Sequence, residues 1–126
     1  SNDDKVAYCF HSVEGFSKVG KYRGNANANG AFVYTGFRPA WVMVKRSDST
    51  GWWGISDSAR STYNEIANTL AANQAYSEST LTSDLNLDFL SNGFKIRDTD
   101  GYYNASGGTY IYLAFAEAPF KYANAR

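Results

Sequence analysis

One stretch restricts the possible folds more than any other. "GAFVYTGFRPAWVMVKR", residues 30–46, alternates apolar and polar side chains on both sides of a Gly-Phe-Arg-Pro step. Alternation with a period of two is the pattern of a strand with one buried face. Because Pro39 has a fixed φ and no backbone donor, we expect a corner at residues 38–40. A chain that turns such a corner passes from one sheet or sheet edge to the next.

Similar short runs, separated by polar turns, fill most of the chain. We predict strands at residues 5–13, 31–37, 41–46, 52–57, 81–90, 94–97 and 109–116, with the last of them central. Aromatic residues make up 17% of the sequence, including ten Tyr and three Trp, and these residue types favour strands. The sequence therefore predicts an all-β fold, an antiparallel β-sandwich of jelly-roll or lectin-like type with about seven or eight strands.

Residues 58–80 break the alternation. Tyr63, Ile66 and Leu70 follow a helical spacing, and Ala is frequent here. We expect one long insert that contains a short helix, or a long ordered loop with a single helical turn. Long inserts in a β domain are often functional or lie at interfaces.

Length and charge limit the possible classes of function. With 126 residues the chain fits a single domain, residues 1–126, with one core. Lys and Arg together number 12, as do Asp and Glu, so the formal charge is zero. This balance argues against nucleic acid as a partner and against a polybasic membrane-surface role. The longest apolar run, residues 110–116, is too short for membrane insertion.

The sequence offers little of the chemistry that catalysis requires. His11 is the single histidine, and no G-x-S-x-G, P-loop or H-E-x-x-H motif is present. Cys9 is the single cysteine, which excludes an intrachain disulfide; we expect it to be a buried small residue rather than a reactive thiol. We therefore expect no enzyme activity, no catalytic residues and no cofactor.

The strongest candidates for a binding site are aromatic residues next to short polar ones. Trp52 and Trp53 are adjacent, so in a strand they point to opposite faces, one toward the core and one toward a surface or interface. Residues 98–108 read as an exposed loop with two further rings and three polar side chains. The predicted ligand-binding residues are Trp52, Trp53, Tyr102, Tyr103, Asp98, Asp100 and Asn104. Rings of this kind stack on sugar faces while short polar groups bind hydroxyls; the alternatives are a subunit contact and core packing.

The same loop, "DTDGYYN", partly resembles a calcium loop. A bidentate Glu at the proper distance is missing, so we interpret the stretch as a plain turn and expect no metal site.

The two ends of the chain resemble each other. "VAYCFHSVEGF" at residues 6–16 and "YLAFAEAPF" at residues 112–120 share a Tyr, a Phe, a Glu and a second Phe in the same order. We expect residues 1–20 to hold a strand shared with, or inherited from, a preceding similar module. The chain would then be the C-terminal part of a longer protein, and its start at Ser1 would reflect processing or excision. Chance likeness between aromatic strands is the alternative.

Three motifs together resemble a known group of proteins. They are "GAFVYTGFRPAWVMVKRSDSTGWW", "LDFLSNGFKIR" and "NASGGTYIYLAFAEAPFKYANAR". This combination is similar to the C-terminal module of an uncharacterised domain of bacteriophage virion proteins, including tail-fibre-like and other structural proteins of marine tailed phages. The resemblance implies a virion location, a structural role, and as partners identical subunits, often trimers, together with other virion proteins.

From the resemblance and the aromatic loop we expect a distal tail-fibre or receptor-binding domain that adheres to a host surface glycan. One alternative is a capsid-decorating or tail-assembly protein that makes only subunit contacts. A second alternative is a polysaccharide-degrading enzyme.

Overall fold

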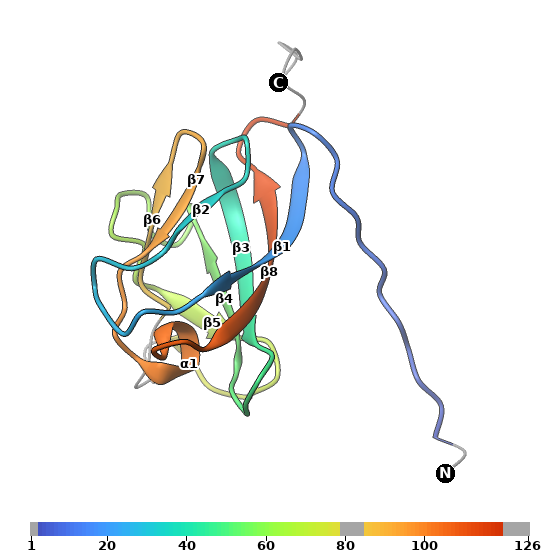
Figure 1. The fold of residues 1–126 in the computed structure, drawn as a ribbon. Helices are drawn as coiled ribbons and strands as arrows, with labels where there is room; N and C mark the ends of the chain where they lie inside the picture. The colour runs from blue at the N-terminus through green and yellow to red at the C-terminus, as the bar shows by residue number, and fades with distance from the viewer. Residues whose placement is uncertain (1–2, 79–84, 120–126) are drawn as a thin grey trace.

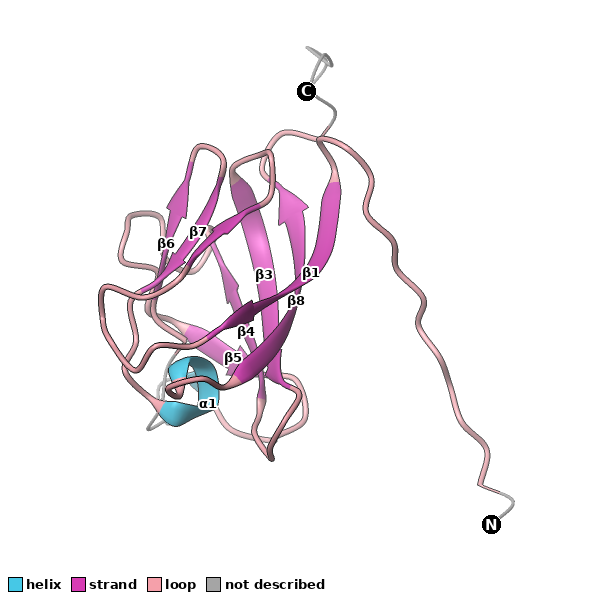
Figure 2. Cartoon of the chain, viewed as in Figure 1, coloured by secondary structure: helices cyan, strands magenta, loops and turns pink. Residues whose placement is uncertain are grey.

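Two antiparallel sheets face each other in the computed structural model, which describes residues 3–78 and 85–119 (Figures 1 and 2). Within these ranges the large sheet has five strands, ordered β1 (Ser17–Arg23), β8 (Thr109–Ala116), β3 (Pro39–Arg46), β4 (Trp53–Asp57) and β5 (Thr69–Ala71). The small sheet has three, ordered β2 (Phe32–Tyr34), β7 (Gly93–Ile96) and β6 (Leu87–Leu90). The predicted all-β sandwich is confirmed, as is the interior position of residues 109–116.

One short helix, α1 (Gly101–Asn104), precedes β8 at one end of the sandwich (Figure 2). Among the described residues, no helix has the length and apolar character needed to cross a membrane.

The core lies between the two sheets and follows directly from the alternation. Val42 and Val44 of β3 face Phe89, Phe94 and Ile96 of the small sheet, and all five side chains are fully buried. Their neighbours in sequence point outward, as a period of two requires. Burial of these apolar side chains provides the main free energy that holds the sheets together.

An aromatic cluster extends this core toward the end of the sandwich that carries α1. The Tyr22 ring stacks on Tyr110 with centroids 4.9 Å apart, and Phe94 meets Tyr22 and Tyr112 edge-on at 6.4 and 5.3 Å. Burial raises the pKa of Tyr22 well above the ordinary value for tyrosine, so the hydroxyl stays protonated. That hydroxyl donates a 2.7 Å hydrogen bond to the Tyr103 carbonyl oxygen.

The predicted corner is present and moves the chain between sheets. β2 ends at Tyr34 in the small sheet, and β3 begins at Pro39 in the large sheet. Pro39 occupies the first residue of its strand, a position that tolerates a missing donor, and the register shifts between Pro39 and Trp41. Arg38 fixes the corner, because its guanidinium donates to the Phe89 carbonyl at 2.8 Å.

The strand predicted at residues 5–13 is wrong. Apart from an isolated bridge between Val13 and Ser17, this segment pairs with no described strand, and Cys9 is exposed rather than buried. A tight turn closed by hydrogen bonds between Val13 and Ser17 follows it, and pairing with β8 starts only at Ser17. The alternation correctly indicates an extended segment, but the apolar side of this segment does not face the core.

Of the two alternatives for residues 58–80, the described part fits the long ordered loop better than the helix with the spacing of Tyr63, Ile66 and Leu70. Residues 58–77 form loops and β5, and a 3-10 turn lies at Glu78. The Ile66 amide donates to the Leu87 carbonyl at 2.8 Å, so this backbone bonds across to the start of β6 instead of along a helix. Residues 79–84, which include the end of this insert and the start of the strand predicted at 81–90, lie outside the described residues.

The sandwich core predicts a contrast between two phenylalanines. Phe94→Ala removes a fully buried ring that contacts both sheets and should lower the free energy of unfolding by about 3–5 kcal/mol. Phe32→Ala on β2, where the side chain is 48% exposed, is the matched control and should cost far less. Urea unfolding measures both, and equal losses would contradict this placement of the core.

Candidate functional site

Two loops meet at the end of the sandwich that carries α1. The turn between β3 and β4 lies against residues 98–108 because β3 and β8 are neighbours in the large sheet. The Ser47 amide donates to the Thr109 carbonyl at 2.9 Å, and Arg46 Nη1 donates to the Gly101 carbonyl at 3.1 Å. The Thr109 amide in turn donates to Asp48 Oδ2 at 3.1 Å. These bonds attach the two loops to each other.

Three rings gather where the loops meet. Trp52 and Tyr102 stack nearly parallel, with centroids 4.8 Å apart and an angle of 7° between the rings. Tyr76, from the long insert, meets Trp52 edge-on at 5.9 Å. We call Trp52, Tyr76 and Tyr102 the ring cluster. Tyr102 remains 36% exposed, so part of the cluster is open to a ligand.

A pocket of about 260 Å³ adjoins the ring cluster and is lined by Arg46, Thr50, Asp100, Gly101 and Tyr102. It places a guanidinium, a hydroxyl and a carboxylate next to an aromatic ring. Its volume is slightly below the range for drug-sized ligands, so it suits a single small unit such as one sugar ring.

Arg46, which lines this pocket, forms an ion pair with Asp48 beside it. Arg46 Nε lies 2.7 Å from Asp48 Oδ1. The hydrogen bond from Arg46, helped by the one from the Thr109 amide, lowers the pKa of Asp48, and the same contact with Asp48 raises the pKa of Arg46. Both groups therefore carry their charges at neutral pH, and the Arg46 guanidinium carbon lies 6.0 Å from the Tyr110 ring centroid.

Asp98 and Asp100 shape the backbone of the loop. Asp100 caps α1 by accepting from the Tyr102 amide at 2.7 Å, and Asp98 accepts from the Asp100 amide at 2.8 Å. Such bonds are typical of Asp in turns and helix caps. Within residues 3–78 and 85–119, no three His, Cys, Asp or Glu side chains group closely enough to hold a metal ion.

Tyr103 and Asn104 anchor the loop to the core. Both are fully buried, so the prediction that they lie in an exposed loop is wrong for these two. Asn104 Nδ2 contacts Asn25 Oδ1 and the Asn27 and Asp98 carbonyls at 2.6–3.1 Å, and Asn104 Oδ1 accepts from the Asn25 amide at 2.9 Å. The Tyr103 ring fills the space at Gly54, where a Cβ would lie 2.6 Å from it.

Neither of the two adjacent tryptophans enters the core, so the prediction that one of them would do so is wrong. Trp52 joins the ring cluster, and Trp53 lies on the side of the large sheet away from the core. The inward positions of β4 belong instead to Gly54 and Ser56, which are buried. Because Gly54 has no side chain, the Tyr103 ring occupies the core space beside it, and that space is not available to a tryptophan side chain.

Of the seven predicted site residues, the structure brings together Trp52, Asp100 and Tyr102, with Asp98 supporting their loop. Sequence reasoning missed Arg46, Asp48, Thr50 and Tyr76. The first three lie at the end of the strand predicted at 41–46 or between it and the strand predicted at 52–57. Pairing of β3 with β8 would have indicated their proximity to residues 98–108. The contact of Tyr76 with Trp52 could not be predicted, because no sequence pattern in the insert indicates that the chain comes back to Trp52.

The fold and the site define a β-sandwich domain with an aromatic and polar surface site between loops at one end. Residues 1–119 match the family described as "Domain of unknown function (DUF7483)", and the chain belongs to that family. No curated protein and no solved structure matches the chain.

The anchoring role of Asn104 predicts a large effect on stability. Asn104→Ala leaves the Asn25 amide and the Asn27 and Asp98 carbonyls without this partner, which should cost about 2–4 kcal/mol. Asn68→Ala, at an exposed position, is the control and should change the free energy of unfolding by about 0.5 kcal/mol or less. Chemical unfolding followed by tryptophan fluorescence measures both; similar small values would show that Asn104 does not anchor the loop.

Proposed function

We propose that this chain is a non-enzymatic structural domain of a phage virion, most simply a distal tail-fibre or receptor-binding domain that adheres to a host surface glycan. The support for the virion location is the resemblance of the three sequence motifs. The support for glycan binding is the ring cluster beside the polar pocket, which is the observation that carries the proposal.

The proposed mode of binding uses both parts of the site. A sugar ring lies against the exposed side of Tyr102, while Arg46, Thr50 and Asp100 exchange hydrogen bonds with its hydroxyls. Because Trp52 already stacks on Tyr102, the ring is held in place and loses little freedom when the ligand binds.

Adhesion in this proposal depends on repetition. One small site of this kind binds weakly, but identical subunits in a homo-oligomer, such as the trimer that the resemblance implies, present several sites at once. The overall strength then exceeds that of any single site without a new contact.

A capsid-decorating or tail-assembly protein is the second candidate. The side of the large sheet away from the core carries apolar residues, including Met43, Trp53 and Leu113, which would serve subunit contacts. In that case the ring cluster would pack against a neighbouring subunit, and no glycan would bind.

Glycan-array binding with single substitutions tests the proposal. For a glycan that the wild type binds, Trp52→Ala and Tyr102→Ala should each weaken the affinity by about tenfold or more, because each substitution removes one ring of the stacked pair. Tyr63→Ala, which removes an equally aromatic side chain that is 83% exposed, is the matched control and should bind as the wild type does. Thermal unfolding of each variant checks that the fold persists.

Other outcomes would overturn the adhesion proposal. Binding that survives Tyr102→Ala would place the ligand elsewhere. No glycan binding, together with particle-assembly defects in the same variants, would favour the decorating or tail-assembly role. Release of reducing ends from host surface polymer would favour a polysaccharide-degrading enzyme; we expect none.

A further inference from the structure

The side of the large sheet that points away from the core is apolar on every strand. The strand registers align Val19 with Leu113, Leu113 with Met43, Met43 with Ile55, and Ile55 with Leu70. One apolar row therefore crosses β1, β8, β3, β4 and β5. A sheet with one face in water usually carries polar residues there, whereas apolar residues on both faces are typical of a sheet covered on both sides.

A second row beside the first is aromatic. Phe115 lies opposite Trp41 in the register, and their ring centroids are 5.5 Å apart. Phe16, in the turn before β1, packs edge-on against Phe115 at 5.8 Å. We call the surface made by the two rows the outer face; its residues are Val19, Trp41, Met43, Ile55, Leu70, Leu113 and Phe115.

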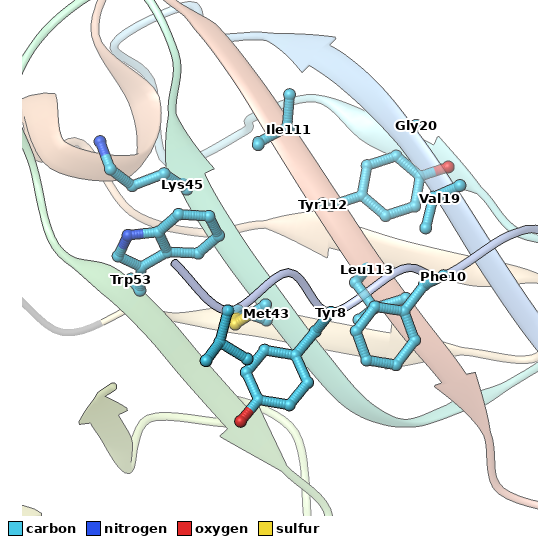
Figure 3. Close-up of a pocket in the computed structure, with 11 residues that line it drawn as sticks. Tyr8, Phe10, Val19, Gly20, Met43, Lys45, Trp53, Ile111, Tyr112 and Leu113 are labelled. Atoms are coloured by element: carbon cyan, nitrogen blue, oxygen red, sulfur yellow. The ribbon is translucent and has the colours of Figure 1, made fainter. Parts of the chain in front are cut away.

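The N-terminal segment, residues 5–13, has the pattern that would cover the outer face. Val6, Tyr8 and Phe10 alternate with polar or small residues, so in an extended chain they point to one side. Phe10 meets Phe115 edge-on with centroids 6.2 Å apart. Figure 3 shows Tyr8 and Phe10 beside Met43 and Leu113 of the outer face.

Within one chain, however, the N-terminal segment covers the outer face only loosely, with a ring contact from Phe10 to Phe115. Val6 is 79% exposed and Tyr8 is 83% exposed. A space of about 800 Å³ lies between the segment and the strands beneath it. Figure 1 shows the segment running along the large-sheet side of the domain, apart from the strands. Val6 and Tyr8 are therefore largely uncovered, and the outer face, apart from the buried Leu113, is only partly covered.

Hydrogen bonds hold the base of the segment against the edge of the sheet. The Ser17 hydroxyl donates to the His11 carbonyl at 3.0 Å, and the Val19 amide donates to Ser12 Oγ at 3.1 Å. These bonds fix residues 11–13 beside β1, the edge strand, so the residues before them leave the domain from that edge. An arm that starts at a sheet edge is well placed to reach a neighbouring molecule.

We propose that the outer face is covered by the N-terminal segment of a second copy of this chain. Each copy supplies one apolar face and one apolar segment, so exchange of segments buries both surfaces on both copies through a single contact repeated by symmetry. Charge supports this choice of occupant: Asp4 directly precedes the segment, and Lys21 and Lys45 lie on the strands that bear the outer face.

The inference rests on the homo-oligomer that the proposed function invokes, but not on a glycan. It assigns the contact that would join the subunits, and it uses side chains other than those of the ring cluster. Assembly and glycan binding can therefore fail separately.

Cross-linking between two different variants tests which copy provides the segment. Both proteins carry Cys9→Ser; one also carries Tyr8→Cys, and the other carries Met43→Cys and a mass tag. Positions 8 and 43 line the same space between segment and sheet. After mixing and mild oxidation, we expect a disulfide-linked dimer of one tagged and one untagged chain, which reduction dissolves. Pairing Tyr8→Cys with Tyr34→Cys, on the exposed side of β2, is the control and should give little product.

The double variant Tyr8→Cys/Met43→Cys tests the alternative in which the segment folds down on its own chain. A disulfide that forms only within this chain, with none between chains in the mixture, would overturn the proposal. No link in either experiment would also overturn it, because another partner would then cover the face.

Sedimentation provides a second measurement that does not depend on substitutions in the sheet. Val6→Asp/Tyr8→Asp changes two exposed side chains and should leave the fold intact, yet weaken self-association by about tenfold or more. Tyr34→Asp, 64% exposed on the small sheet, should associate as the wild type does. A wild type that stays monomeric would overturn the proposal. One-site glycan binding that persists in the dissociated variant would show that the ligand proposal stands by itself.

Discussion

Buried tyrosine hydroxyls of the large sheet hold the loop on which the candidate site depends. The Tyr110 hydroxyl donates to the Gly101 carbonyl at 2.8 Å and accepts from the Ala105 amide at 2.7 Å, while Tyr22 donates to the Tyr103 carbonyl. A tyrosine in a core needs a partner for its hydroxyl, and a loop that crosses a core end needs partners for its backbone. Here the tyrosine hydroxyls and the loop backbone are hydrogen-bond partners of each other.

This arrangement explains how a polar loop becomes a fixed platform. α1 is too short to be stable by itself, and its backbone is held by the tyrosines, by the Asp100 cap and by Asn104. With Tyr103 buried as an anchor, the next residue along the chain, Tyr102, points outward and stacks on Trp52. Binding residues carried on loops and positioned by a rigid β scaffold are a common arrangement in recognition domains.

Much of the fold could be predicted because its central strands bury one face. Alternation identified β2, β3, β4, β7 and β8, and Pro39 identified the passage between sheets. β1 was missed because Tyr22 is its single buried apolar residue. Gly20, two positions earlier, leaves room for the Tyr112 side chain, since a Cβ there would lie 2.8 Å from the Tyr112 hydroxyl, so the strand lacks a regular apolar pattern. Residues 5–13 were predicted as a strand because alternation does not reveal whether a pairing partner exists. The jelly-roll or lectin-like subtype and the module repeat stay predictions.

The site was only partly predictable, for a physical reason. Tyr102 and Tyr103 are chemically identical neighbours in a polar stretch, and only the space beneath Gly54 decides which one is buried. Asp98, Asp100 and Asn104 look like ligand groups, but they satisfy the backbone of their own loop and that of residues 25–27. Arg46 and Asp48 join the site through pairing of β3 with β8, which local sequence does not display.

Hydrogen exchange of the Ala105 amide in Tyr110→Phe measures whether the buried tyrosine hydroxyls hold the loop. The substitution keeps the ring in the core and removes only the hydroxyl that bonds Gly101 and Ala105. We predict that Ala105 loses its protection relative to the wild type while the amides paired between β3 and β8 keep theirs. Unchanged protection at Ala105 would contradict this prediction, because the loop would then be held by something other than the buried tyrosines.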